Sequence, residues 1–236
     1  MAQNASGGKT MSDLYKNLKQ VTPWEEIHFK CTNCGECCRH VKQQVPVEAL
    51  DAYRIARYLR NHGEDIQYMD DFLEKYAEPV LLDECGYFVY FLKTRGDDDA
   101  CIFLEDNRCR IHAVNPRACR TYPFVIEPDE KGNFTHWISC EREHHFVGPI
   151  VHPKLWIKKR FTAGDKTFLY MDFSKAKEIA MLLRKIPEDR LVSALLHFQF
   201  AKYGGIDLDK PFIPQYEKNM QQLIKNLTRM SNESMG

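Results

Sequence analysis

The sequence predicts an α+β chain: a small cysteine-rich domain of short hairpins and a few helices, followed by a C-terminal helical extension. Eight of the nine cysteines fall in two blocks between residues 31 and 140, and no cysteine follows them. Around these blocks, short aromatic and β-branched runs alternate with turn residues, whereas apolar residues recur at helical spacing after residue 150. We therefore predict a polar tail and lead-in over 1–22, the cysteine-rich domain over 23–150, and the helical extension over 151–236.

The composition is typical of a soluble globular protein, with 44% apolar and 28% charged residues. Lysine plus arginine equals aspartate plus glutamate at 33 each, so net charge gives no reason to expect a nucleic acid or an anionic membrane as partner. No run approaches the roughly 18 apolar residues of a membrane span, and the N-terminus lacks the charged start and apolar core of a signal peptide. We predict a cytoplasmic protein that binds neither nucleic acid nor membrane.

Before the first cysteine block, residues 1–12 are too polar to fold and are predicted to form a tail. Residues 27–29 are predicted to form a short strand that leads into the cysteines. Between them, four apolar residues recur at helical spacing and predict a helical segment: Leu14, Tyr15, Leu18 and Val21.

Between the two blocks we predict a helix with Pro46 at its first position that ends before Gly63, then a short helix over about 70–77. Residues 86–92 are rich in aromatic and β-branched residues and predict a strand buried on both faces. Cys85, at the entrance of this strand, is expected to be a small buried apolar residue. The first helix also has a basic face that we expect to be solvated: Arg54, Arg57 and Arg60.

The second block is predicted to contain two hairpins and a rigid turn. Residues 101–112 predict a hairpin that places Cys101 and Cys109 on opposite sides of an Asp106-Asn107 turn. Pro116 and Pro123 are expected to open and close a helical turn that carries Cys119. A second hairpin, over 124–126 and 134–138, would bring Cys140 back to the other thiols.

The C-terminal part is predicted to start with a linker at 151–153 and to continue as three helices. Ser174 is expected to cap a helix that ends at Ile186, Pro187 to begin a second that ends near Gly204, and Pro214 to begin a third that ends near Met230. The last helix has an apolar stripe that is predicted to pack on the core or, as the alternative, to bind a second copy or a client protein: Met220, Leu223, Ile224 and Leu227.

Four thiols within eight residues, Cys31-x2-Cys34-x2-Cys37-Cys38, predict metal ligation. Disulfides do not persist in a reducing compartment, so clustered cysteines there indicate metal or redox chemistry. Gly35 follows the second cysteine and can adopt the positive φ that a tight chelating loop needs.

Three motifs carry a resemblance to a known family. They are Phe-x-Cys-x2-Cys-Gly-x-Cys-Cys at 29–38, Cys-x-Phe-Leu with Cys-x-Ile at 101–111, and Asn-Pro-Arg-x-Cys-Arg-x-Tyr-Pro-Phe at 115–124. Over about residues 27–145 the chain resembles the cysteine-cluster (CxxCxxCC) zinc- or iron-chelating family, which includes the flagellin lysine N-methylases. His112, Asn115 and the segment 141–145 depart from the pattern of that family. The resemblance implies metal binding.

We predict eight thiolate ligands: Cys31, Cys34, Cys37, Cys38, Cys101, Cys109, Cys119 and Cys140. Cys31, Cys34 and Cys37 have the spacing that supplies three ligands to a [4Fe-4S] cluster, with the fourth from the second block, and zinc would use the same residues. Adjacent side chains are expected to diverge, so Cys37 and Cys38 should not share one ion and two centres are the simpler arrangement.

Arginines lie within a residue or two of the predicted ligands: Arg39, Arg108, Arg110, Arg117 and Arg120. They are expected to stabilise the thiolates or, as the alternative, to bind a carboxylate or phosphate, and Arg39, Arg117 and Arg120 are the predicted cofactor-binding residues. Four histidines are expected at the surface or behind the ligands, and none enters the predicted ligand set: His40, His112, His144 and His145.

Two functions are compatible with these motifs. The first is a metal-binding protein whose iron-sulfur cluster or zinc serves structure, electron transfer or metal handling. The alternative is a protein lysine N-methylase that uses S-adenosylmethionine, as the resemblance to flagellin N-methylases implies, with a protein substrate or client as partner. The lone Ala163-Gly164-Asp165 is not the Gly-rich turn of a Rossmann-like methyltransferase, and the Cys-x3-Cys-x2-Cys order of radical enzymes is absent, so metal binding is the better-supported prediction.

Overall fold

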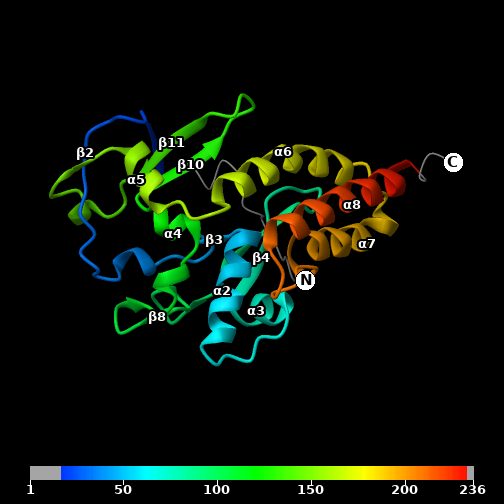
Figure 1. Cartoon of the computed structure of the whole chain (residues 1–236), viewed down its shortest axis with the longest axis horizontal. Coiled ribbons are helices and arrows are strands. Elements are labelled where there is room, and N and C mark those ends of the chain that lie inside the picture. The colour runs from blue at the N-terminus through cyan, green and yellow to red at the C-terminus, as the bar shows by residue number, and fades with distance from the viewer. Residues whose placement is uncertain (1–16, 233–236) are drawn as a thin grey trace, which may run out of the picture.

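The computed structural model describes residues 17–232, which form the predicted α+β arrangement (Figure 1). The helices are α2 (Ala49–Asn61), α3 (Met69–Tyr76), α4 (Arg117–Thr121), α5 (Pro153–Arg160), α6 (Asp165–Leu183), α7 (Glu188–Gln199) and α8 (Phe212–Asn232). Shorter helical turns are η1 (Glu36–Cys38), η2 (His112–Val114), η3 (Glu143–His145) and the π-helical η4 (Phe200–Gly204). No helix within 17–232 is long and apolar enough to cross a membrane.

The strands are short and pair antiparallel in small sheets. They are β1 (Leu18–Val21), β2 (Ile27–His28), β3 (Pro46–Val47), β4 (Ala77–Leu81), β5 (Phe88–Leu92), β6 (Thr94–Arg95), β7 (Ala100–Cys101), β8 (Leu104–Glu105), β9 (Arg108–Cys109), β10 (Phe124–Pro128), β11 (Phe134–Ser139) and β12 (Ile150–Val151). Two three-stranded sheets have the orders β1-β11-β10 and β3-β5-β4. The remaining strands form the pairs β12-β2, β6-β7 and β8-β9.

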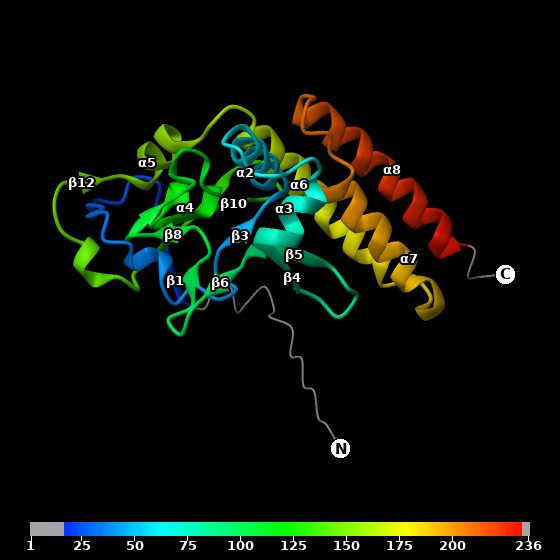
Figure 2. The same cartoon turned by 90° about the horizontal axis from the view of Figure 1, so that it is seen from below.

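The main hydrophobic core joins the cysteine-rich segment to the C-terminal helices. Its fully buried aromatic side chains come from both parts of the chain and include Phe72, Phe103, Phe198 and Tyr216. A smaller core lies between the β1-β11-β10 sheet and the helices α5 and α6: Val21, Phe124, Ile126, Ile138, Ile157 and Leu169. In Figures 1 and 2, β2 and α5 lie at one end of the molecule, while α6, α7 and α8 gather at the other.

Most predicted elements are confirmed because their signals are local. Helix α3, strand β5 and the β10-β11 hairpin form where the patterns predict them, and α4 lies between the two prolines. Helix α7 follows Pro187, and α8 begins two residues before the predicted start. Its apolar stripe packs on the core, since Met220, Leu223 and Leu227 are buried.

Four local predictions are wrong. The helical segment predicted from Leu14 to Val21 is strand β1 where the structure describes it, because residues 18–21 pair with β11; Leu14 and Tyr15, like the predicted tail, lie outside the described residues. Pro46 belongs to β3, and α2 begins only at Ala49. The predicted linker at 151–153 instead leads into α5, which has Pro153 in its first turn. Ser174 lies inside α6 and donates to the Met171 carbonyl within the helix.

The basic face of α2 is not simply solvated, because its arginines contact other parts of the chain. Arg54 pairs with Asp165 at 2.5 Å, Arg57 donates to the Tyr53 hydroxyl at 2.8 Å, and Arg60 pairs with Asp209 at 2.6 Å. Two of these three contacts attach α2 to the chain after residue 160.

Candidate metal centres

The first cysteine block forms a tight loop that packs against the β8-β9 turn. Gly35 has φ 77°, as the chelating loop requires, and precedes the single turn η1. A Cβ at Gly35 would lie 3.1 Å from the Asn107 carbonyl oxygen, so the two turns are in close contact. Arg142 supports the loop from the other side, since its guanidinium donates to the carbonyls of Glu36 at 3.3 Å and Arg39 at 3.1 Å.

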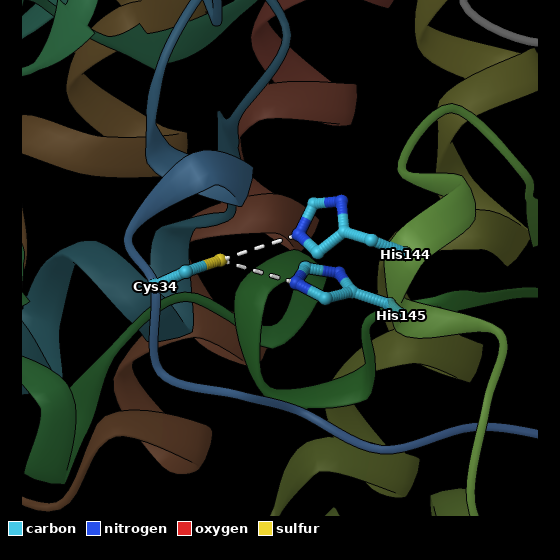
Figure 3. A group of neighbouring side chains, drawn as sticks. All are labelled: Cys34, His144 and His145. Carbon is cyan, nitrogen blue, oxygen red and sulfur yellow. Dashed lines mark hydrogen bonds between the residues drawn. The ribbon is translucent and has the colours of Figure 1, made fainter.

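Cys34 faces two histidines from a distant part of the chain (Figure 3). Its Sγ lies 3.5 Å from His144 Nε2 and 3.3 Å from His145 Nε2, and the three atoms lie within 4.8 Å of one another. A tetrahedral zinc ion with ordinary bond lengths separates a sulfur from a nitrogen ligand by about 3.5 Å. The donor types and their spacing therefore fit a metal ion, and we call these three residues the mixed centre.

His145 is held by its surroundings. It is 1% exposed, and its ring packs edge-on against Phe29 and Tyr122, with centroids 6.0 and 5.9 Å away. Its Nδ1 lies 3.4 Å from the Tyr122 hydroxyl, which leaves Nε2 directed at Cys34. Its carbonyl accepts a bond of 2.9 Å from the Lys30 amide. Ligating histidines commonly use their second ring nitrogen in this way, and the hydrogen bond fixes the orientation of the ring.

The surroundings of Cys34 also favour its thiolate. Burial alone would raise the pKa of Cys34, but hydrogen bonds outweigh this effect and lower the pKa to about 6. In decreasing order of effect these bonds involve the Thr32 side chain, His144, the Glu36 backbone and His145. A thiolate at neutral pH is the form that binds metal.

Five further thiols interact with one another electrostatically, and we call them the thiol group: Cys37, Cys38, Cys101, Cys109 and Cys119. Among residues 17–232, no three of their sulfurs lie within 4.8 Å of one another, in contrast to the donor atoms of the mixed centre. The five thiols come from η1, β7, β9 and α4, and electrostatic interactions link Cys119 to Cys101, Cys109 and Cys37. Cys37 also interacts with Cys34, so it lies between the thiol group and the mixed centre. The predicted hairpin around Asp106-Asn107 forms as β8 and β9, but only Cys109 lies in it, opposite Leu104. Cys101 precedes this hairpin in β7, opposite Thr94, and still interacts electrostatically with Cys109.

The adjacent thiols Cys37 and Cys38 do not diverge as predicted. Their sulfurs lie 3.9 Å apart, and two thiolates on a tetrahedral zinc ion are separated by about 3.8 Å. Both residues lie in the 3-10 turn η1. The spacing of this pair therefore permits both sulfurs to bind one ion.

Burial keeps most of the thiol group protonated in the absence of a cation. It raises the pKa of Cys101 to about 11, raises that of Cys109, and raises that of Cys119 well above its usual value. The hydrogen bond with Cys38 lowers the pKa of Cys37 to about 7 and raises that of Cys38. A bound cation would offset the cost of holding several buried thiolates together.

The helix that carries Cys119 is anchored by buried carboxylates. Asp51 is 2% exposed and accepts from the Arg117 amide at 2.8 Å, at the start of α4. The Arg117 side chain donates twice to Glu48, at 2.8 and 2.7 Å. Arg120 donates to both oxygens of Asp165, at 3.0 and 3.1 Å, and to Asp51 at 3.2 Å. Burial raises the pKa of Asp51 against the opposing charges of Arg120 and Arg117.

Asp165 has the opposite shift in this network. Burial would raise its pKa, but the hydrogen bonds from Thr162 and Arg54 and the charge of Arg120 lower the pKa of Asp165 below its usual value. The network thus holds a carboxylate of α6 against an arginine of α4.

The predicted cofactor-binding arginines are therefore engaged with the protein itself. Arg117 and Arg120 bind the carboxylates just described, while Arg39 pairs with Asp98 and donates to Asn107 Oδ1 at 2.8 Å. Of the other arginines near the thiols, Arg110 pairs with Glu64 at 3.1 Å and Arg108 is exposed.

The other cysteines lie outside both clusters. Cys31 is exposed, with its Sγ 3.5 Å from Asn33 Oδ1, and Cys140 is exposed directly after β11. Cys85 is buried, as predicted for a small apolar residue, and burial raises its pKa.

Sequence reasoning missed His144 and His145 as candidate ligands. The available signal was a pair of consecutive histidines shortly after Cys140, in the segment that departs from the family pattern. Their separation from Cys34 by 110 and 111 residues hides the contact, because it forms only when β11 and η3 return to the first loop.

Thiols and imidazoles gathered from separated loops are characteristic of small metal-chelating domains. Residues 30–141 match the family model CxxCxxCC, whose description is "Putative zinc- or iron-chelating domain". This match confirms the resemblance predicted from the motifs. His144 and His145 lie just beyond the matched residues. No solved structure matches the chain.

Proposed function

We propose that this chain is a zinc- or iron-binding protein with two neighbouring metal centres. The observation that carries the proposal is the division of the first cysteine block. Cys34 contacts the two histidines, whereas Cys37 and Cys38 lie 3.9 Å apart and interact electrostatically with thiols of the second block.

The donor set of the mixed centre suits zinc. One thiolate and two imidazoles are ligands that zinc binds readily, and the spacing of the three atoms matches its tetrahedral geometry. A [4Fe-4S] cluster is held mainly by cysteines, so it fits this donor set less well.

The thiol group suits either a structural zinc ion or an iron-sulfur cluster. Cys38, Cys101, Cys109 and Cys119 would supply four thiolates from four elements, and all four contribute to the main core or pack against it. A metal held there would join η1, two hairpins and α4, so its binding energy would contribute to folding. All nine cysteines are free in the structure.

Metal analysis of protein purified without oxygen tests this proposal. We expect about two metal sites per chain, and iron that is matched by sulfide and a brown colour would identify a cluster in the thiol group. Cys34→Ser and His145→Ala should each remove the metal of the mixed centre, and Cys119→Ser that of the thiol group. His112→Ala, which changes an exposed histidine of η2, is the matched control and should keep both. A folded chain that carries no metal would contradict the proposal.

The resemblance to flagellin lysine N-methylases adds a second experiment. S-adenosylmethionine is titrated into the metal-loaded protein, and the visible spectrum and the methylation of lysines in a flagellin substrate are followed. Methyl transfer to lysine that is lost in Cys119→Ser or Cys34→Ser would make the chain an enzyme. Without any such transfer, the chain is a metal-binding module.

A further inference from the structure

We propose that the mixed centre keeps an open fourth position, which takes an exchangeable small anion, and that Cys31 stays outside its coordination shell. This inference rests on the proposed function, because it concerns how Cys34, His144 and His145 hold their metal. It differs from the prediction that Cys31, Cys34 and Cys37 bind one centre together.

The chain offers three ligands at this point. Among residues 17–232, no fourth cysteine, histidine or carboxylate places a ligand atom within 4.8 Å of all three donor atoms. That limit is generous, since ligands of a tetrahedral zinc ion lie within about 3.8 Å of one another. Zinc sites with three protein ligands keep their remaining position for water or an exogenous ligand.

The thiols on either side of Cys34 in the first block have other contacts. The Cys37 sulfur lies 3.9 Å from that of Cys38, as part of the thiol group. The Cys31 thiol is directed at Asn33 Oδ1, at 3.5 Å, on the exposed side of the loop. The close packing at Gly35 and the hydrogen bonds from Arg142 hold the loop after Cys34 in place. We therefore expect Cys37 not to move toward the histidines.

One side of the mixed centre faces solvent. His145 is buried behind the centre against Phe29 and Tyr122, whereas His144 is exposed and Cys34 is half-buried. Figure 3 shows both rings reaching from η3 toward Cys34 on the opposite loop. An ion bound between them would therefore be backed by His145 and accessible to solvent beside His144.

The charge of such a centre favours an anion. Zinc with one thiolate and two neutral imidazoles carries (+2) + (−1) = +1, whereas four thiolates would leave −2. Arg142 adds positive charge nearby and donates to backbone carbonyls of Glu36 and Arg39. Arg160 interacts electrostatically with Cys31. The loop that carries Cys34 and the turn that carries the histidines also contain three acidic residues, whose charges oppose this effect. Glu141 accepts a hydrogen bond from Asn17 at 3.0 Å, and Glu36 and Glu143 are exposed.

Cobalt substitution with azide as the probe tests the inference on the full chain. Co²⁺ replaces zinc and reports its ligands through its visible bands, and azide is a small anion that can occupy an open position. We expect azide to change the bands of the wild-type and Cys31→Ser proteins equally. His144→Ala should lose one equivalent of cobalt together with the azide response, and His112→Ala should behave like the wild type. Cys31→Ser should alter zinc affinity less than about 2-fold, and Cys34→Ser should lower it at least about 100-fold.

Two results would overturn the inference while leaving the proposed function intact. One is a His144-dependent cobalt site whose bands azide does not change. The other is the loss of that same site in Cys31→Ser, which would make Cys31 the fourth ligand. If His144→Ala binds as much metal as the wild type, the mixed centre does not bind metal. A loss of metal in Cys119→Ser would then show that the thiol group is the metal site of the chain.

Discussion

The mixed centre and the thiol group both use cysteines of the first block, but they differ in their ligands and in their burial. The thiol group uses cysteines of the family motifs, and all its members except the exposed Cys37 contribute to the main core or pack against it. The mixed centre takes one cysteine from those motifs and two histidines from beyond them, and it lies at the surface. Buried sites are tied to folding, whereas exposed sites can change ligands at little structural cost. We therefore expect metal in the thiol group to support the fold and metal in the mixed centre to affect stability little.

The largest effect should follow loss of metal from the thiol group. Cys119→Ser, or removal of metal by a chelator, leaves buried thiols without a cation and frees α4 from the hairpins. We expect the free energy of unfolding to fall by about 4 kcal/mol or more. Thermal unfolding followed by circular dichroism checks this, with Cys140→Ser, at an exposed thiol, as the control. An unchanged melting temperature in Cys119→Ser would remove the distinction between the two centres.

The next effect should come from the carboxylate that ties α6 to α4. Asp165→Asn removes the charge facing Arg120, and removal of one partner of a buried ion pair costs about 3 kcal/mol. Asp165 is 3% exposed, whereas Asp209, which pairs with Arg60, is 76% exposed. Asp209→Asn is thus the matched control and should cost less than 1 kcal/mol. Denaturant unfolding of both variants measures the difference, and equal costs would show that α4 does not depend on this network.

The elements that carry the thiols of the second block could be predicted from sequence because their motifs are local. Prolines bracket Cys119, and turn residues mark the hairpin that carries Cys109. Cys34 with His144 and His145 could not be predicted in this way, because the contact depends on the return of the chain after β11. Strand β1 was missed for a related reason, since pairing with the same strand β11 decides its conformation. Both features were missed because they depend on long-range contacts made by β11 and the residues that follow it.

A smaller effect is expected where the first loop meets the second block. Gly35→Ala forces an alanine to φ 77° and places its Cβ 3.1 Å from the Asn107 carbonyl oxygen. Gly63→Ala is a close control, because Gly63 has φ 89° with nothing within 4 Å of the added atom. The backbone conformation alone costs about 1–2 kcal/mol in each variant. Gly35→Ala should cost roughly 1 kcal/mol more and should also weaken metal binding.

Equilibrium unfolding and metal content of the two glycine variants test this expectation. If Gly35→Ala and Gly63→Ala lose the same stability and both retain their metal, the contact with Asn107 does not shape the loop.

The smallest effect on stability is expected at His144, and this variant best separates metal binding from stability in the mixed centre. The side chain is exposed, so His144→Ala should change the free energy of unfolding by no more than about 0.5 kcal/mol. The same variant should lose the metal of the mixed centre, because two remaining ligands do not make a stable zinc site. His145→Ala should lose the same metal but should also cost about 2 kcal/mol, since that ring is buried against Phe29 and Tyr122. Metal content measured beside unfolding separates the two roles. A large loss of stability in His144→Ala would mean that the mixed centre, like the thiol group, is part of what holds the fold together.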